Sequence, residues 1–340
     1  MRIATYNVEW FTSLFDRQGR MLEDDQASAR YKVSRAEQLG AIAIVMSAVD
    51  ADLMLVVEAP DANGRRHTVP MLESFAAHFG LRTRAAVLGF ANDTQQEIAL
   101  LYDPDRIALR HDPRDDGPEA PRFDTTLAID LDIDARLDQV RFSKPPLEAE
   151  VTLKGGDAAA ALRLIGVHIK SKAPHGATTP EAATRIAIEN RRKQLAQSIW
   201  LRRRIDAHLD RGESLIVLGD FNDGPGLDEF EALFGRSGLE IVAGAELPPA
   251  RRMHDPHTRL RGAHTTAAAP SSARFYLPER GAYFSAMLDY VMLSPDLCAT
   301  RPRWRIWHPF DDPACYATPE LREALLQASD HFPVTVDLEL

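Results

Sequence analysis

The sequence predicts an α/β protein in which two β-sheets pack together with helices outside them. Short runs rich in Ile, Val and Leu, each about four to eight residues long, stop at polar residues in the manner of buried strands. Helical patterns separate some of these runs, whereas other strands follow one another directly, as in Glu148 to Val167. This mixture of alternating and consecutive strands indicates two packed sheets.

The predicted elements follow from these patterns in chain order. The strands are Arg2–Tyr6, Leu53–Val57, Ile98–Tyr102, Leu162–Val167, Leu215–Leu218, Tyr290–Leu293 and Val334–Leu338. The helices are Ser34–Ala48, Pro180–Leu209, Leu227–Phe234 and Pro319–Ala328. Ser34 with Glu37 three positions later has the form of a capping box, and Pro180 fits the first turn of a helix.

We expect one domain over residues 1–340, because no repeat and no long linker interrupts the pattern. Two stretches are typical of surface insertions. Residues 103–146 hold many Asp, Arg and Pro residues, and residues 247–280 are rich in Pro, His, Ala and Ser. Loops of this length in a compact domain are usually functional rims or lack fixed structure.

Composition excludes several classes of protein. Apolar residues make up 45% and charged residues 26%, which is typical of a soluble globular chain rather than a disordered one. The apolar stretch Ala41–Val49 is too short to cross a bilayer, and Asn7 and Glu9 interrupt any signal-peptide core. Cys298 and Cys315 have no metal or redox spacing. A cytoplasmic enzyme is the expectation.

Net charge limits the partners. The 50 acidic and 40 basic residues give a formal charge of −10, which argues against a protein that coats duplex nucleic acid. An acidic protein can still hold one local phosphate site, especially if metal ions supply positive charge there.

Polar residues gather at the strand ends. A carboxylate that closes a buried strand loses solvation and needs a cation, a donor or a metal as partner. In sheet-based enzymes such ends converge on one rim. The residues concerned are Asn7, Glu9, Glu58, His168, Asp220, Asn222, Asp289, Asp330 and His331.

These residues lie in motifs that resemble a known family. The motifs are TYNVEWF (5–11), VVEAP (56–60), EIALLYDP (97–104), GVHIKSK (166–172), VLGDFND (217–223), LDYVMLS (288–294) and SDHFPV (329–334). Together they resemble the endonuclease/exonuclease/phosphatase superfamily, which includes deoxyribonuclease I-like and exonuclease III-like enzymes. The resemblance implies a four-layer α/β sandwich of two packed mixed β-sheets flanked by helices.

The resemblance also implies hydrolysis of a phosphoester by water with Mg²⁺, for which Mn²⁺ can substitute. Glu58 matches the principal metal-binding glutamate of the family, and Asn7, Glu9 and Asp330 would complete the metal environment. Magnesium prefers oxygen ligands and keeps several waters, so one or two carboxylates suffice. Two positions depart from the family pattern: Val57 replaces the usual Gln, and Glu9 stands where some relatives have Asp.

The remaining motif residues carry catalytic roles in the resemblance. His331 would contact the phosphate or help activate water, with Asp289 fixing its imidazole. Asp220 would orient or deprotonate the attacking water, and Asn222 would donate to a phosphate oxygen. His168 would bind the phosphate from the other side and protonate the leaving oxygen. Which group is the general base stays open.

Two further residues belong to the predicted site. Glu97 resembles the glutamate that supports the first histidine in the deoxyribonuclease branch, with an edge-strand salt bridge as the alternative. Lys170 follows His168 by two residues, so along a strand it shares its face. We expect Lys170 to bind substrate phosphate together with Asn7 and Asn222.

The substrate stays open between two classes. HIKSK resembles nuclease-like members and favours nucleic acid, whereas the acidic charge favours a small phosphorylated substrate such as a phosphoinositide, a sphingolipid headgroup or a nucleotide. A catalytically silent binding protein on the same fold is the remote alternative. We expect a monomer without a transmembrane segment.

Overall fold

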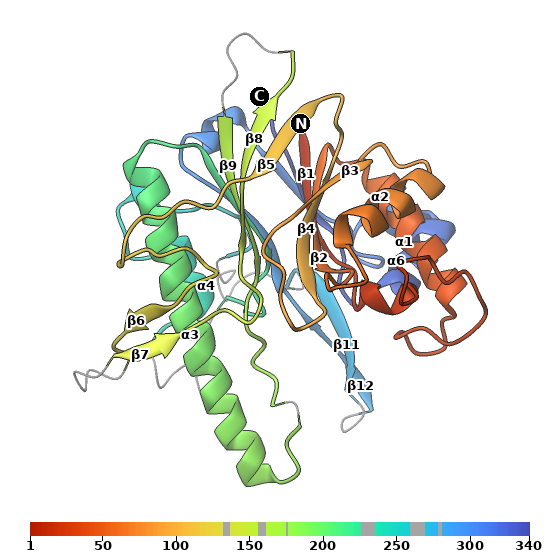
Figure 1. The fold of residues 1–340 in the computed structure, drawn as a ribbon, viewed down its shortest axis with the longest axis horizontal. Helices are drawn as coiled ribbons and strands as arrows, with labels where there is room; N and C mark the ends of the chain where they lie inside the picture. Colours follow the sequence, from red (N-terminus) through yellow and green to blue (C-terminus); the bar gives the residue numbers. More distant parts are fainter. Residues whose placement is uncertain (132–136, 156–160, 175, 226–234, 259–268, 278–280) are drawn as a thin grey trace.

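The computed structural model describes residues 1–131, 137–155, 161–174, 176–225, 235–258, 269–277 and 281–340. Figure 1 shows two sheets packed face to face, with helices covering the outer face of each, so the molecule is the four-layer α/β sandwich expected from the sequence. Both chain termini lie at one end of the sheets. The predicted helix Leu227–Phe234 lies outside the described residues.

The first sheet has six strands in the order β14-β15-β1-β2-β4-β3. β1 and β2 run parallel, and the other neighbours run antiparallel. The bounds are β1 Arg2–Asn7, β2 Leu53–Ala59, β3 Ala85–Leu88, β4 Glu97–Tyr102, β14 Arg303–Ile306 and β15 Val334–Asp337. Because β1 and β2 are parallel, their carboxyl ends lie side by side at one edge.

The second sheet has five strands in the order β13-β10-β9-β8-β5. Its one parallel pair is β9 with β10, so two carboxyl ends again lie together. The bounds are β5 Ile107–His111, β8 Leu147–Leu153, β9 Ala161–His168, β10 Leu215–Asp220 and β13 Asp289–Leu293. Two separate hairpins complete the strands, β6 (Leu127–Ile129) with β7 (Asp138–Val140), and β11 (Ala273–Leu277) with β12 (Ala282–Ala286).

Helices α1, α2 and α6 cover the six-stranded sheet, and α3 with α4 cover the five-stranded one (Figure 1). The bounds are α1 Arg35–Val49, α2 Thr68–His78, α3 Pro180–Asp210, α4 Gly238–Ala243, α5 Pro313–Ala317 and α6 Pro319–Ala328. The capping box predicted at Ser34 and Glu37 is present. None of the described helices is long and apolar enough to cross a membrane.

The core has two parts, one on each face of the six-stranded sheet. Along β2, Leu55 and Val57 face the second sheet, whereas Met54 and Val56 face α1 and its neighbours. All four side chains are fully buried or nearly so, which explains why this strand is a continuous apolar run rather than an alternating one. The sheets pack closely at Gly166, where an added Cβ would lie 2.4 Å from a methyl carbon of Leu55.

Candidate active site

Residues from both sheets meet at the end of the sandwich where the parallel strands finish. The six-stranded sheet supplies Asn7 and Glu58, and the segment before β15 supplies His331. The five-stranded sheet supplies His168 and Asp220. With Asn222 and Asp289, these residues form what we call the central cluster. The amide of Asn7 donates to Oδ2 of Asp220 at 3.2 Å and so joins the two sheets.

Strand register places three members of the central cluster side by side. In the pairing of β9, β10 and β13, Asp220 lies opposite His168 on one side and opposite Asp289 on the other. Gly219 makes the approach possible: its φ is 139°, and an added Cβ would lie 2.0 Å from the carbonyl oxygen of Val167. The glycine of the GDFN motif is therefore a packing requirement of the site.

Glu58 and Asn222 are held in unusual backbone conformations. Glu58 sits at the bulge where the register of β2 with β4 shifts between Val57 and Ala59, and its φ is 60°. Asn222 has a φ of 49°. Left-handed conformations of residues other than glycine cost free energy and tend to occur at functional sites. The bulge turns the Glu58 carboxylate toward the cluster, where the backbone N–H of Trp10 donates to it at 2.9 Å.

Asp220 is the most connected carboxylate of the cluster. The backbone N–H of Asn222 donates to its Oδ1 at 2.8 Å, and the Asn222 amide donates to its Oδ2 at 3.1 Å. Nε2 of His168 lies 3.6 Å from that Oδ2. Burial raises the pKa of Asp220 to about 7, with the positive charge of His331 opposing the rise and the negative charge of Asp289 adding to it.

Asp289 and His331 form the pair predicted from the sequence. Nδ1 of His331 lies 2.8 Å from Oδ2 of Asp289, and both side chains are buried. The hydroxyl of Ser272 donates to the same Oδ2 at 2.7 Å. Burial acts to lower the pKa of His331, but the carboxylates of Asp289 and Asp220 outweigh it and hold that pKa well above its usual range.

Lys144 is a member of the site that the sequence analysis did not identify. Its Nζ lies 3.2 Å from both ring nitrogens of His168. Burial lowers the pKa of Lys144 to about 8, an effect that the charges of Glu58 and Asp220 partly oppose. Burial and the Lys144 charge together hold the pKa of His168 well below its usual range. The surroundings therefore shift the pKa values of the two histidines in opposite directions, favouring the neutral form of His168 and the cationic form of His331.

Glu9 and Asp330 lie together at the margin of the cluster. The guanidinium of Arg30 contacts the carboxylate of Glu9, which also accepts the backbone N–H of Asp330 at 3.1 Å. Burial and the neighbouring Asp330 raise the pKa of Glu9 to about 7, with Arg30 opposing the rise. Arg30 therefore pairs with Glu9, the carboxylate that the sequence analysis expected to contribute to a metal site. No sequence motif indicated this arginine.

Glu97 is buried at the start of β4, and its described partners differ from the expected one. It accepts hydrogen bonds from the backbone N–H of Ala62 at 3.2 Å and from the side-chain amide of Asn92 at 2.7 Å. Burial raises its pKa to about 7. The described hydrogen bonds therefore tie Glu97 to the loops beside β4 rather than to His168.

Lys170 lies close to the cluster without a side-chain bond to it among the described contacts. Its backbone N–H donates to the side-chain oxygen of Gln197 at 2.9 Å, which fixes the segment after His168 against α3. Its positive charge contributes to the lowered pKa of both His168 and Lys144. Two lysine charges, those of Lys144 and Lys170, therefore act on His168.

The central cluster contains side-chain atoms that could act as ligands of a metal cation. One ligand atom each from Asp220, Asp289 and His331 lies within 4.8 Å of the others. Oδ1 of Asp289 is buried and has no hydrogen-bond partner among the described residues, while Oδ2 is bonded to His331 and Ser272, so Asp289 adds buried negative charge to the cluster in its role beside His331. Glu58 adds carboxylate oxygens near His168, whereas Asn7 directs its amide N–H to Asp220 and accepts the backbone N–H of Glu9 through Oδ1 at 3.0 Å. Hard divalent cations take such oxygens, whereas the imidazole of His331 is already bonded to Asp289.

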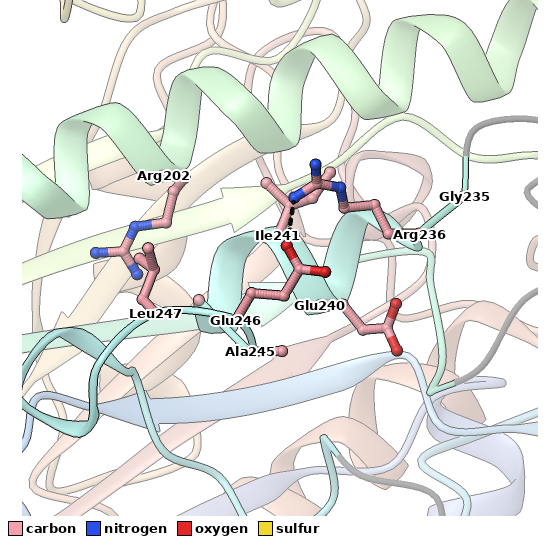
Figure 2. Close-up of a pocket in the computed structure, with 9 residues that line it drawn as sticks. Arg202, Gly235, Arg236, Glu240, Ile241, Ala245, Glu246 and Leu247 are labelled. Atoms are coloured by element: carbon pink, nitrogen blue, oxygen red, sulfur yellow. Dashed lines mark hydrogen bonds and ion pairs between the residues drawn. The ribbon is translucent and has the colours of Figure 1, made fainter.

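A separate cavity of about 360 Å³ lies between α3 and α4 (Figure 2). Its polar side chains have partners: Arg236 pairs with Glu246 at 3.1 Å, and Arg202 pairs with Asp206. Its lining residues are Arg202, Gly235, Arg236, Glu240, Ile241, Gly244, Ala245, Glu246 and Leu247. It contains none of the predicted site residues.

Comparison with known proteins identifies the class. Residues 4–331 match the sequence model of the Endonuclease/Exonuclease/phosphatase family. The chain belongs to that family, whose members hydrolyse phosphoester bonds. No curated protein sequence matches it.

Solved structures with a similar overall arrangement share little sequence with this chain. The human Nocturnin catalytic domain with bound sulfate is 14% identical, and its alignment covers 100% of this chain and 94% of the Nocturnin chain, with a TM-score of 0.49. Truncated TDP2 of Caenorhabditis elegans is 12% identical, with coverage of 98% and 95% and a TM-score of 0.48. The mannosyl-6-phosphatase Bt3783 of Bacteroides thetaiotaomicron is 12% identical, with coverage of 100% for both chains and a TM-score of 0.49.

Proposed function

We propose that this protein is a divalent-metal-dependent phosphodiesterase that cleaves nucleic acid by in-line attack of water. The observation that carries the proposal is the convergence, from two sheets, of Asp220, Asp289 and His331 with His168 and Glu58. A phosphodiester is anionic and repels hydroxide, so its hydrolysis needs charge neutralisation and a positioned water. The cluster offers groups for both tasks.

Mg²⁺ is the cofactor that suits these oxygens best, and Mn²⁺ is the natural substitute. Glu58, with Asn7 beside it, would hold the ion. The Asp220 carboxylate accepts a hydrogen bond from Asn7 and so lies next to this proposed metal position. The ion would supply Lewis-acid stabilisation of the phosphoryl oxygens. Glu9 and Asp330 would act at the margin, where Arg30 already balances part of their charge.

The protein's own groups divide the proton chemistry between them. A cationic His331, oriented by Asp289, would donate a hydrogen bond to a non-bridging phosphate oxygen. Asp220, whose pKa is raised to about 7, is suited to accept a proton from the attacking water at neutral pH. His168 and Lys144 would face the leaving oxygen, where the ammonium of Lys144 can stabilise the developing charge. Asn222 would hold Asp220 in place and donate to phosphate.

Nucleic acid is favoured by the local charge. The charges of Lys144 and Lys170 both act on His168 in a chain whose net charge is −10, so the site carries local positive charge against the overall balance. That same acidic balance favours the second candidate, a small phosphorylated substrate.

A substrate panel separates the two. Purified protein with Mg²⁺ is tested on duplex DNA, single-stranded DNA, apurinic DNA, inositol phosphates and a generic aryl phosphodiester, with Asp220→Asn as matched control. We expect cleavage of nucleic acid and of the aryl diester by the wild type only. Turnover confined to phosphomonoesters or inositol phosphates would select the second candidate. No hydrolysis of any ester would contradict both.

A further inference from the structure

The β11–β12 hairpin presents exposed aromatic rings beside the central cluster. Tyr276 is 54% exposed, Tyr283 is 58% exposed and Phe284 is 48% exposed. In Figure 1 the hairpin projects from the end of the sandwich opposite to the chain termini, which is the end where β1 and β2 finish. Large exposed rings gathered on a protruding hairpin are unusual on a monomeric surface and mark a contact surface.

The base of this hairpin is hydrogen-bonded to the backbone of Asp330 and His331. Ala273 forms a β-bridge with His331, and the backbone N–H of Arg274 donates to the carbonyl of Asp330 at 2.7 Å. Ser272, the residue before β11, holds Asp289 through its hydroxyl. The hairpin therefore cannot shift without moving the groups that surround the reacting phosphate.

The two faces of the hairpin differ in what they touch. In the antiparallel register Phe275 lies opposite Phe284, and Tyr276 lies opposite Tyr283. Because side chains alternate along a strand, the two phenylalanines share one face and the two tyrosines the other. The ring of Phe275 packs edge-on against His331, with 5.6 Å between ring centroids. The phenylalanine face is thus the one directed to the active site.

The tyrosine face has a partner of its own. The guanidinium of Arg274 stacks 3.7 Å from the ring centroid of Tyr283, and the rings of Tyr276 and Tyr283 are 5.3 Å apart. These contacts support the hairpin from the side away from His331. Directly opposed residues of an antiparallel pair have Cβ atoms about 5 Å apart, so Phe284 lies next to Phe275 on the phenylalanine face. Phe284 is the exposed ring of that face.

We propose that Phe284, backed by Phe275, is a stacking platform for an unpaired nucleobase next to the scissile phosphate, so that the preferred substrate is a single-stranded or unpaired segment rather than intact duplex. This inference rests on the proposed nuclease function. Every base offers a flat π-face, but in a duplex that face is already stacked on its neighbours. An exposed phenylalanine therefore gains most from a base that has left the helix.

The surroundings favour a nucleic acid strand over a lipid surface as the occupant. The phenylalanine face adjoins the central cluster through the contact of Phe275 with His331, and Lys144 supplies positive charge in that cluster beside His168. Such a combination of flat rings and cations suits a chain of bases joined by phosphates. Membrane insertion calls instead for a strongly apolar tip or face.

The test uses matched variants on the two faces of one hairpin. Phe284→Ala removes the proposed platform, Phe284→Trp keeps a stacking ring, and Tyr276→Ala removes an equally exposed ring from the other face. The readout is kcat/KM with Mg²⁺ on a single-stranded oligonucleotide, and on the same oligonucleotide with tetrahydrofuran abasic residues placed in turn around the cleavage point. Stacking on an aromatic ring predicts a loss of about fivefold to a hundredfold for Phe284→Ala, restored by Phe284→Trp.

The abasic substrates identify the partner of the ring. At one position, removing the base should cost the wild type as much as Phe284→Ala costs, and the two changes together should cost no more than either alone. Tyr276→Ala should leave kcat/KM within about twofold. Additive losses at every position, or equal effects of Phe284→Ala and Tyr276→Ala, would overturn the inference while leaving the nuclease function in place. Failure of the wild type to cleave any nucleic acid would overturn both. Reduced binding of Phe284→Ala to anionic liposomes, with unchanged cleavage of oligonucleotides, would assign the hairpin to a membrane instead and reject the inference.

Discussion

Among the carboxylates that this protein buries, those under α3 and those in the central cluster are neutralised differently. Under α3, Glu148 is 1% exposed and receives two hydrogen bonds from Arg204, at 2.6 and 3.0 Å. In the central cluster, Asp220 and Asp289 are equally buried, but their described partners are histidine, asparagine and serine. Arg204 also reaches Asp116, and His208 lies 3.6 Å from Glu148, so in the α3 region Arg204 is the nearest cation to Glu148 within a wider ion-pair network.

The difference separates carboxylates that stabilise the fold from carboxylates that are available for catalysis. Arginine stays charged at any pH that a protein meets, so it neutralises a carboxylate permanently. Histidine and lysine can give up a proton within the physiological range, and a metal can add to a carboxylate that no arginine covers. The margin of the site is intermediate, because Arg30 covers Glu9 there. If this division holds, substitutions in the central cluster should reduce turnover, and substitutions under α3 should reduce stability.

The largest effect is expected for Glu58→Gln. The variant keeps the shape of the side chain but removes the charge that would hold the metal, so we expect turnover to fall by about a thousandfold to ten-thousandfold, since a metal supplies several kcal/mol of transition-state stabilisation. Circular dichroism and the urea midpoint check that the fold is intact. Near-normal turnover in a folded Glu58→Gln protein would remove Glu58 from the metal site.

The next effect compares Asp289→Asn with Asp330→Asn. Asp289→Asn keeps the contact geometry but weakens the orientation of His331, so we expect turnover to fall by about a hundredfold to ten-thousandfold with little change in the Mg²⁺ midpoint. Asp330→Asn should instead raise the Mg²⁺ concentration needed for half-maximal activity. Activity measured against Mg²⁺ concentration gives both values. A shifted midpoint for Asp289→Asn and an unchanged one for Asp330→Asn would reverse the two roles.

Arg204→Met should act on stability rather than on turnover. It leaves Glu148 buried without its cation, and breaking a buried pair in this way costs about 3–5 kcal/mol of unfolding free energy. Arg236→Met is the matched control, because the pair of Arg236 with Glu246 is exposed and such pairs contribute about 1 kcal/mol or less. Urea unfolding measures both, and kcat per folded molecule should stay near the wild-type value. A loss of kcat without a loss of stability would contradict the division between the regions.

The smallest effect is a pH dependence of stability. The pKa of folded His331 lies above its unfolded value, so the Asp289–His331 pair contributes its full stabilisation below the unfolded pKa of about 6.5 and loses it as pH rises through the folded pKa. The difference in unfolding free energy between the wild type and Asp289→Asn, measured with chelator from pH 5 to 9, should therefore shrink toward the alkaline end. A difference that is constant over this range would show that the pair does not titrate as proposed.

The sequence predicted most of the fold because its central strands are buried on both faces. Continuous apolar runs such as Leu53–Val57 mark these strands, and β1, β2, β9, β10, β13 and β15 lie where they were expected. Helix α2 was missed although Met71, Leu72 and Phe75 have helical spacing. β5 was missed because it lies in a stretch rich in Asp, Arg and Pro, where only Ile107 among its residues is fully buried.

The site was predictable where local sequence specifies it and not where tertiary structure does. Strand ends located His168, Asp220 and Asp289, because the register then brings them together. Lys144 carries no such signal: it is one lysine in a long loop, and only folding brings it to His168. Arg30 is of the same kind, since its contact with Glu9 joins a surface loop to a strand end.

The central claim is that the carboxylates of the central cluster, which have no described arginine partner, act with a divalent metal in phosphodiester hydrolysis. The most direct measurement is the cleavage rate of single-stranded DNA by protein stripped with chelator, followed by titration with Mg²⁺ and then with Mn²⁺ in separate samples. We predict no turnover in the stripped protein, recovery of activity with either ion, and no recovery in Glu58→Gln at the same ion concentrations. Full turnover in the presence of excess chelator would contradict the account.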